Sequence, residues 1–274
     1  MTSEQYEVVV VRHGTRLARR SEVFLNFGIY GDADRAHTVD YFFWIIRDEE
    51  RTVLVDTGFA AGAAARRGRT VLVDPATAYR ELGIDLDAPL DIVVTHAHYD
   101  HIGNLGLFAN ATIIVAEAEL NFWASEVSTR PQIAHFTERD EVDALLRMRD
   151  EGRVRTFSGS LQLASGIEII EVGGHTPGQS MLTVETSAGM VLLASDAVHF
   201  REELEREMPF VSVTDLVGMY KGFALVKRML SGRPGSILLP GHDGDVLGTV
   251  SALEVGASSP LHGLVGSIGG GGRR

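Results

Sequence analysis

Histidine and aspartate side chains gather in one short stretch of the sequence. Residues 96–101 place His96, His98, Asp100 and His101 within a few positions of one another. In an extended segment, residues two apart point to the same side, so the imidazoles of His96 and His98 can converge on one metal ion. If a helix begins next, Asp100 and His101 point in other directions and can serve a second metal ion nearby, where the helix N-terminus also favours a carboxylate. Three imidazoles and a carboxylate packed together without a metal would be electrostatically awkward, so the pattern indicates a metal site.

Three further ligand-type residues lie at the ends of apolar segments later in the chain. His175 stands in a Gly-rich turn after a predicted strand, and Asp196 and His242 each follow an apolar strand and a small residue. A catalytic metal ion needs about four or five donors, one of them water, so these residues can complete two sites. A buried polar side chain costs free energy unless something binds it, which also favours a ligand role. The sequence therefore predicts a centre of two divalent metal ions, with zinc as the first choice.

The elements that must position these residues form two runs of strands with helices between and after them. The first run of apolar segments predicts strands at residues 8–11, 41–46, 52–55, 91–95 and 111–115, with a hairpin turn at residues 47–51. The second run predicts strands at residues 154–157, 161–163, 167–172, 181–185, 190–194 and 236–239. Helices are expected at residues 117–126, 140–149 and 215–230, and residues 60–67 form either a short helix or a mobile flap. Two sheets packed face to face with helices outside, an α/β fold, satisfy this order.

The composition limits the partners and the metal ligands of the protein. The formal net charge of −12 argues against nucleic acid as a partner, because a phosphate-binding surface needs clustered Lys and Arg. The absence of cysteine leaves His and carboxylate side chains to hold a metal ion. We find neither a secretory signal nor an apolar run long enough to span a membrane. We therefore expect a cytoplasmic protein, not bound to a membrane, that acts on a small-molecule substrate.

The length of the chain suits one large domain. We expect this domain to occupy residues 1–250, because no segment rich in Pro, Gly or Ser divides the chain before its end. After about residue 247 the periodic pattern is lost, and the run of glycines at 269–272 is followed by two arginines. We therefore expect residues 251–274 to form a flexible C-terminal tail.

Seven residues together resemble the ligand set of the metallo-β-lactamase superfamily: His96, His98, Asp100, His101, His175, Asp196 and His242. The resemblance covers the chain from about residue 8 to residue 247. It implies an αββα sandwich with the metal centre at one edge. It also implies how the ligands divide, with one metal ion held by His96, His98 and His175, the other by Asp100, His101 and His242, and Asp196 bridging both. Asp56 matches the aspartate that orients a ligand histidine in such proteins.

Within the superfamily, the chain is similar to the acyl-homoserine lactonases. The bridging-type Asp196 and the lack of cysteine argue against the antibiotic-hydrolysing branches, and the spacing from His101 to His175 is longer than in glyoxalase II. Residues 16–27 and 41–46 also look like the lactonase group. The resemblance implies a dinuclear metallohydrolase that opens a lactone, an acyl-homoserine lactone or a similar one, with a hydroxide activated by two metal ions. Such an activity is quorum quenching, and a homodimer is compatible with it.

One departure from the lactonase pattern concerns residue 199. Several lactonases carry a tyrosine three positions after the bridging aspartate, where it contacts the substrate, and this chain has His199 there. On a helical turn, positions three apart share a face, so we expect His199 to point toward the metal ions and the substrate. Asp196, together with Asp100 or His199 as the proton donor to the leaving alkoxide, is therefore the expected catalytic set.

Other functions stay open as alternatives. Relatives with the same pattern act on other lactones, activated esters, aryl ethers or thioesters, and an iron-dependent oxygen or sulfur enzyme uses the same ligand types. Residues 12–16, Arg-His-Gly-Thr-Arg, resemble the phosphohistidine loop of histidine acid phosphatases, but Ala18 stands where that motif has proline. That interpretation also leaves the histidine cluster without a purpose, so we expect His13 to be a strand-end residue near the site. A binding module without catalysis is not favoured, because all seven ligands are present.

Overall fold

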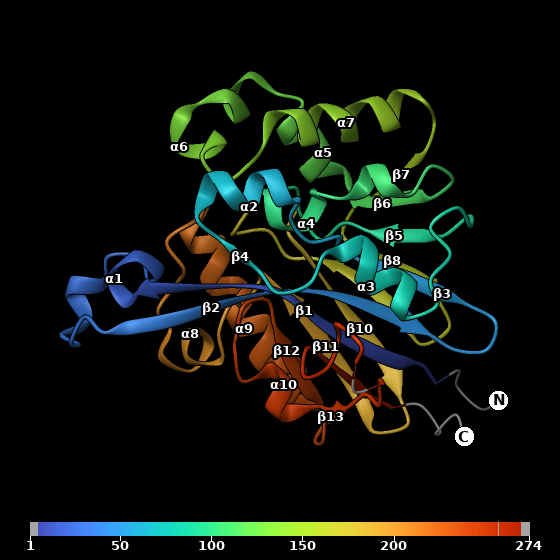
Figure 1. Ribbon diagram of the computed structural model, residues 1–274. Helices are drawn as coiled ribbons and strands as arrows, with labels where there is room; N and C mark the ends of the chain where they lie inside the picture. Colours follow the sequence, from blue (N-terminus) through green and yellow to red (C-terminus); the bar gives the residue numbers. More distant parts are fainter. Residues whose placement is uncertain (1–4, 257, 270–274) are drawn as a thin grey trace.

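Two apolar faces on one strand explain the layered architecture. Strand β1 (Glu7–Arg19) begins with a run of valines. Because side chains of a strand alternate between faces, Val8 and Val10 pack into one core while Val9 and Val11 pack into another. A sheet built from such strands must be covered on both sides. The computed structural model, which describes residues 5–256 and 258–269, shows this sheet facing a second sheet, with helices outside both (Figure 1).

The first sheet has nine strands within the described residues, in the order β13-β14-β1-β2-β3-β5-β6-β7, with β4 paired to β1. Its other strands are β2 (Ala36–Arg47), β3 (Thr52–Val55), β4 (Thr70–Val71), β5 (Asp91–Val93), β6 (Thr112–Ala116), β7 (Val154–Phe157), β13 (Ser251–Ala252) and β14 (Val265–Ile268). Strands β3, β5, β6 and β7 pair in parallel, so their carboxyl ends meet at one edge of the sheet.

The second sheet, five-stranded in the described part of the chain, runs in the order β12-β11-β10-β9-β8. Its strands are β8 (Ser160–Ala164), β9 (Ile167–Glu171), β10 (Ser180–Thr186), β11 (Gly189–Ser195) and β12 (Ile237–Pro240). Thr95, just after β5, has its hydroxyl oxygen 2.9 Å from that of Ser195 at the end of β11. The two sheets therefore end at a common edge, where loops from both can meet.

Helices cover the outer face of each sheet. On the first sheet, α3 (Pro75–Glu81), α5 (Glu117–Trp123) and α7 (Arg139–Asp150) supply Tyr79, Trp123 and Leu145 to the core. On the second sheet, α8 (Arg201–Arg206) and α9 (Leu216–Gly232) supply Leu204 and Phe223. The remaining helices are α1 (Arg20–Val23), η1 (Phe27–Tyr30), α2 (Ala61–Arg67), α4 (Tyr99–Ile102), η2 (Leu105–Leu107), η3 (Glu126–Thr129), α6 (Pro131–Ala134) and α10 (Val246–Thr249). Among the described helices, none combines the length and apolar composition that crossing a membrane requires.

This arrangement is the αββα sandwich that the sequence predicted. The segment 60–67, for which two forms stayed open, contains the short helix α2. Strands β1 and β2 extend well past the apolar runs that predicted them, and their outer parts project from the sandwich as a two-stranded ribbon that ends near α1 (Figure 1). The polar residues of this ribbon gave no strand signal because its faces are less apolar than those of the core strands.

The C-terminal segment differs from the expectation. Strand β14 pairs antiparallel with β1, with Val8 opposite Ile268, and β13 extends the same edge. Leu261 is fully buried, and Val265 packs into the same core. The prediction of a flexible tail is therefore wrong for residues 251–256 and 258–269, because this segment pairs with the first strand of the chain, a partner that local pattern cannot reveal. Residues 270–274, for which flexibility was also expected, lie outside the described residues.

Candidate metal centre

Loops at the common edge of the two sheets bring the candidate ligands together. The loops after β5, β11 and β12, the connection between β9 and β10, and helix α4 supply them: His96, His98, Asp100, His101, His175, Asp196 and His242. None of the seven is more than 7% exposed. Their ligand atoms form groups within 4.8 Å of one another, among them His96 with His98 and His175, and Asp100 with His101 and His242. These are the two sets that the family resemblance assigns to separate metal ions.

Asp196 lies at the centre of the group. Its Oδ2 is 3.1 Å from Nε2 of His242 and 3.4 Å from Nε2 of His175. Its Oδ1 is 3.5 Å from Nε2 of His101. A carboxylate between both sets of imidazoles is placed to bridge two cations. Residue 241 must be glycine here, because a Cβ at that position would collide with Oδ1 of Asp196.

Hydrogen bonds on the far side of three imidazoles set their orientation. Nδ1 of His101 lies 2.7 Å from Oδ2 of Asp56. Nδ1 of His175 lies 2.8 Å from the carbonyl oxygen of Ser212, and Nδ1 of His242 lies 2.8 Å from the carbonyl oxygen of Asp40. A carbonyl oxygen only accepts, so Nδ1 carries the proton and Nε2 presents its lone pair to the cluster.

The turn after β3 holds Asp56 in an unusual backbone conformation. Its φ of 57° lies in the left-handed region, which costs a non-glycine residue about 1–3 kcal/mol. The carboxylate is fully buried and accepts hydrogen bonds from the backbone N–H and the hydroxyl of Thr95, both at 2.8 Å. The turn directs the carboxylate of Asp56 toward Nδ1 of His101, so the strained backbone helps to position a candidate ligand.

The buried atoms of the group fit divalent metal ions. In the described part of the chain, Nε2 of His96, Nε2 of His101 and Oδ1 of Asp196 are buried without a hydrogen-bond partner. Such atoms are rare and costly in folded proteins, and cations would satisfy all three. Burial lowers the pKa of His98 to about 3 and the pKa values of His96 and His175 well below the usual range. These imidazoles are therefore neutral, which is the form that binds metal ions.

A buried carboxylate that the sequence analysis missed ties two of the ligand loops together. Oε1 of Glu119 accepts hydrogen bonds from the N–H of Ala97, at 2.8 Å, and from Nε1 of Trp123, at 2.6 Å. Its Oε2 accepts from the hydroxyl of Thr176, at 2.7 Å, and from the N–H of Gly178, at 3.0 Å. Ala97 lies between His96 and His98, and Thr176 follows His175, so this carboxylate holds the loops of one candidate ligand set. No sequence signal marks it, because an acidic residue in the first turn of a helix, beside Glu117, is more often exposed to solvent.

His199 points in the direction that the sequence analysis expected, but its partners differ from the expected ones. It is fully buried, and it does not line either of the cavities described below. The ring of Phe210 stacks on its imidazole at 4.1 Å. Its Nε2 lies 3.2 Å from Oδ2 of Asp196, and its Nδ1 lies 3.1 Å from the buried carboxylate of Glu203. His199 thus points toward the cluster, as predicted from the helical spacing, but it reaches Asp196 and not the space open to a substrate.

His13 is a core residue inside β1, at a β-bulge, and not a strand-end residue. It is fully buried beside Phe59 and Phe43, with ring centroids 4.3 and 5.7 Å away. Burial, with His101 and His242 nearby, lowers the pKa of His13 to about 3. An inaccessible neutral imidazole in a strand cannot serve as the nucleophile of a phosphatase loop.

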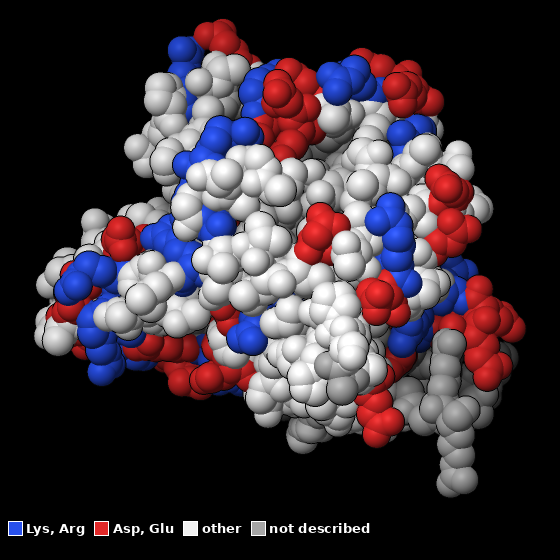
Figure 2. Space-filling view, in the orientation of Figure 1, with Lys and Arg blue, Asp and Glu red and all other residues white. Residues whose placement is uncertain are grey.

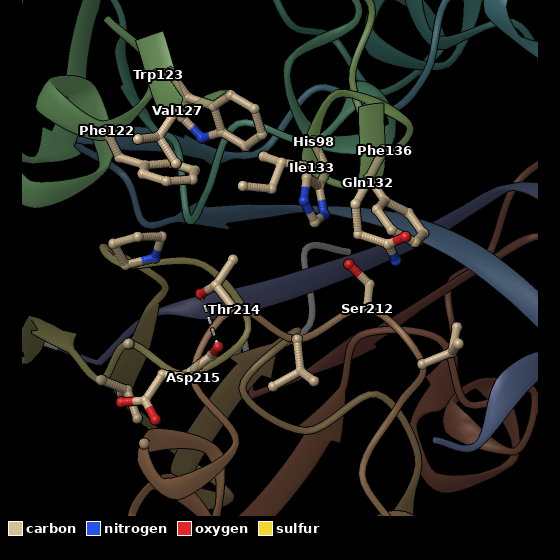
Figure 3. Close-up of a pocket in the computed structure, with 17 residues that line it drawn as sticks. His98, Phe122, Trp123, Val127, Gln132, Ile133, Phe136, Ser212, Thr214 and Asp215 are labelled. Atoms are coloured by element: carbon tan, nitrogen blue, oxygen red, sulfur yellow. Dashed lines mark hydrogen bonds between the residues drawn. The ribbon is translucent and has the colours of Figure 1, made fainter. Parts of the chain in front are cut away.

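Two adjoining cavities open beside the cluster. The cluster cavity, of about 420 Å³, is lined by five of the seven candidate ligands: His98, Asp100, His175, Asp196 and His242. The apolar cavity, of about 670 Å³, is lined mainly by apolar side chains from α5, η3, α6 and the loop before α9. Figure 3 shows Phe122, Trp123, Val127 and Ile133 around this cavity, with His98 and Phe136 at its side. His98, Phe136 and Ser212 line both cavities, so the two spaces share a wall at the cluster.

Comparison with known families is decisive for the fold. Residues 40–256 match the family model described as "Metallo-beta-lactamase superfamily". The chain belongs to this superfamily. Membership confirms the predicted αββα sandwich, and together with the cluster of His and Asp it makes the protein a metallohydrolase.

Several relatives within the superfamily are lactonases. An N-acyl homoserine lactonase of Bacillus sp. is 26% identical over 215 residues, covering 73% of this chain and 80% of that protein. A probable metallo-hydrolase of Mycobacterium tuberculosis is 28% identical over 186 residues, covering 61% of this chain and 60% of that protein. A crystal structure of a quorum-quenching N-acyl homoserine lactone lactonase has the same fold, with a TM-score of 0.70 at 22% identity, over 89% of this chain and 94% of that one. A dizinc quorum-quenching lactonase also has it, with a TM-score of 0.69 at 17% identity, over 100% of this chain and 97% of the other.

Proposed function

We propose that this metallohydrolase opens a lactone, an acyl-homoserine lactone or a related one, at a centre of two zinc ions. The observation that carries the proposal is the cluster of seven buried His and Asp side chains centred on Asp196, five of which line the cluster cavity and one of which, His98, also lines the apolar cavity. Relatives named as N-acyl homoserine lactonases support the substrate class. An enzyme with this activity would quench quorum-sensing signals.

The five imidazoles and the two aspartates would hold the metal ions in two sets, with His96, His98 and His175 in one, Asp100, His101 and His242 in the other, and Asp196 shared. When bound, two such ions supply a water nucleophile of lowered pKa and an electrophile for the carbonyl oxygen. A donor set of imidazoles and carboxylates fits zinc.

Asp100 is the residue that we propose moves the proton. Its carboxylate lines the cluster cavity and is 7% exposed, so a bound substrate can touch it. In the hydrolysis, the acyl carbon gains the oxygen of water while its bond to the ring oxygen breaks. Asp100 takes the proton that the water loses and gives it to the leaving alkoxide, so the product is a hydroxy acid.

We propose that His199 is a positioning residue for Asp196. Glu203 accepts from the backbone N–H of His199 at 2.5 Å and lies against Nδ1 of the same residue, which fixes the ring. The ring then presents Nε2 to Oδ2 of Asp196. This arrangement repeats that of Asp56 behind His101, where a buried carboxylate orients an imidazole of the cluster.

The apolar cavity is the proposed site for the apolar limb of the substrate. A ligand site is typically concave and largely apolar with a few polar groups at the reacting end, and the wall shared at His98 has that character. An acyl chain in the apolar cavity would leave the lactone carbonyl beside the cluster.

A hydrolysis screen of the zinc-loaded protein tests the proposal. The substrates are acyl-homoserine lactones of several chain lengths, aromatic lactones and aryl esters, with acid release followed by a pH indicator. We expect at least one lactone to be opened with a higher kcat/KM than any aryl ester. Asp100→Asn should lower kcat by about 10²- to 10⁴-fold. The control variant Asp87→Asn, at an exposed position, should leave kcat unchanged. Hydrolysis of aryl esters without any lactone would contradict the proposed substrate class.

A further inference from the structure

One side of the cluster cavity is basic. Arg16, Arg67 and Arg69 line it together with the ligands of the candidate metal centre. They come from the ribbon part of β1, from the end of α2 and from the segment just before β4. Figure 2 shows basic side chains gathered in this region, around α2 and toward the projecting ribbon.

Two of these three arginines have no carboxylate partner in the part of the chain that the structure describes. Arg67 pairs with Glu138 at 2.8 Å. Arg69 donates from Nε to the phenol oxygen of Tyr99 at 2.9 Å and from Nη1 to the carbonyl oxygen of Arg67 at 2.6 Å. Within residues 5–256 and 258–269, Arg16 makes no side-chain hydrogen bond and no ion pair. The guanidinium groups of Arg16 and Arg69 therefore bring to the cavity positive charge that no ion pair among the described residues neutralises.

A shortage of acidic residues does not explain this imbalance. The chain has 37 acidic residues against 25 lysines and arginines. Elsewhere in the protein a buried arginine does have acidic partners: Arg20 forms ion pairs with both Glu202 and Asp32. A half-buried guanidinium without a paired carboxylate is available to bind an anion that enters the cavity.

The acidic side chains that share the cavity are engaged elsewhere. Asp100 and Asp196 belong to the candidate metal centre. Glu22 is exposed, and its carboxylate accepts from the backbone N–H of Arg19 at 2.7 Å. None of these three lies within ion-pair distance of Arg16 or Arg69 in the described residues.

Aromatic rings support the basic side of the cavity. The guanidinium of Arg69 lies 5.9 Å from the ring centroids of both Tyr41 and Tyr99, and that of Arg67 lies 4.2 Å from Tyr99. Both tyrosines also line the cavity. These rings and the hydrogen bond to Tyr99 hold Arg69 in place before a ligand arrives, so little of its side-chain freedom is lost when an anion binds.

We infer that Arg16 and Arg69 form a subsite for an anionic group of the substrate, a carboxylate, beside the reacting carbonyl. The inference rests on the proposed function, since it names a feature of the lactone that the same centre would open. The substrate then has two limbs, an apolar one in the apolar cavity and an acidic one on the arginines, with the scissile ester bond between them.

The test compares two lactones that differ only in charge. One is a γ-lactone bearing a carboxylate, 5-oxotetrahydrofuran-2-carboxylate, and the other is its carboxamide. With the zinc-loaded protein, kcat/KM and the Kd from titration calorimetry are measured for both. A charged hydrogen-bond pair discriminates by about tenfold or more, so we expect the carboxylate to be favoured by at least that factor in both quantities.

Variants show whether the arginines cause the preference. Arg16→Met removes a charge without breaking any side-chain hydrogen bond or ion pair among the described residues, and Arg69→Met removes the second cation. We expect each to lower the preference for the carboxylate at least threefold, and the double variant to bring it near one, while values for the carboxamide stay within threefold. Arg80→Met, at an exposed site on α3 that does not line the cavity, is the matched control for general charge steering and should keep the full preference.

The outcomes separate the subsite from the proposed function. Equal Kd values for the two lactones in the wild type, or a preference that the arginine variants keep, would overturn the subsite. A preference in Kd that depends on Arg16 and Arg69 supports the subsite even if neither lactone is turned over. Absence of turnover for every lactone of the wider screen, with two metal ions bound, would count against the proposed function alone.

Discussion

Replacing Glu119 by glutamine should loosen the loops of one candidate ligand set. The carboxylate accepts four hydrogen bonds, and three of the donors are N–H groups that cannot act as acceptors: those of Ala97, Trp123 and Gly178. A glutamine can turn its oxygen toward Ala97 and Trp123, and the hydroxyl of Thr176 can then accept from its NH₂ group. The N–H of Gly178 is left facing another N–H.

The size of the effect follows from this count. The N–H of Gly178, buried without an acceptor, costs about 1–3 kcal/mol. The hydrogen bonds from Ala97 and Trp123 remain but lose a charged acceptor, which weakens each by about 0.5–1 kcal/mol. Burial raises the pKa of Glu119, so part of this loss is offset when the charge is removed. We expect Glu119→Gln to lower the free energy of unfolding by about 2–4 kcal/mol.

The assay is chemical unfolding of the chelator-treated protein, with metal content measured on the zinc-loaded protein. Since Ala97 and Thr176 adjoin His96, His98 and His175, we expect the metal content of Glu119→Gln to fall toward one ion per chain. Glu117→Gln, at an exposed position on the same helix, is the control and should change the free energy of unfolding by less than about 0.5 kcal/mol. If the two variants behave alike in both measurements, Glu119 does not hold the ligand loops.

Three further predictions concern the centre and the core. Wild-type protein purified without chelator should contain about two transition-metal ions per chain, and Asp196→Ala should contain less than one. A maximum of one ion per chain in zinc-supplemented wild-type protein would contradict a two-metal centre. Iron in place of zinc would favour an oxygen or sulfur enzyme. His199→Phe should weaken metal binding by about 10- to 100-fold along with activity, whereas full metal content with lost turnover would return His199 to substrate contact. The pKa of His13, lowered by burial to about 3, lies below the value of about 6.5 in the unfolded chain, so its stabilising neutral form is present above pH 6.5 and stability is lost as the pH falls from there toward 3. Between pH 7 and pH 5 the loss in free energy of unfolding should be about 2 kcal/mol. It is measured as the difference between wild type and His13→Leu in how the free energy of unfolding depends on pH. Equal pH dependence in the two proteins would show that His13 is not buried in the neutral form.

Much of the candidate centre could be predicted because its ligands lie at positions with a local signal. Each of His175, Asp196 and His242 follows an apolar strand, and carboxyl ends of strands from two sheets meet at one edge. The layered fold followed from the same signal, since segments such as residues 8–11 are apolar on both faces. These properties depend on neighbouring residues, and so they are visible in one sequence.

Residues that act through distant partners could not be found in this way. Glu119 and Glu203 are acidic residues on helices, like many that lie in solvent. The burial of Glu119 depends on the loop of Thr176, far away in the chain, and that of Glu203 on how residues 199–210 fold around it. The strand β14 has only a few apolar residues, and its partner is the first strand. Hydrogen-bond partners across long separations leave no periodic pattern, because folding alone brings them together.

Residue 199 shows the boundary between the two kinds of information. The spacing from Asp196 correctly indicated that its imidazole turns toward the cluster, because three positions on a helical turn share a face whatever surrounds them. Whether that imidazole meets a substrate or another protein group depends on Phe210, which packs over it from a loop, and on Glu203, which holds its other nitrogen. Types and spacing of residues therefore indicate the chemistry of this protein, while the packing of side chains in the folded structure selects which groups a substrate can reach.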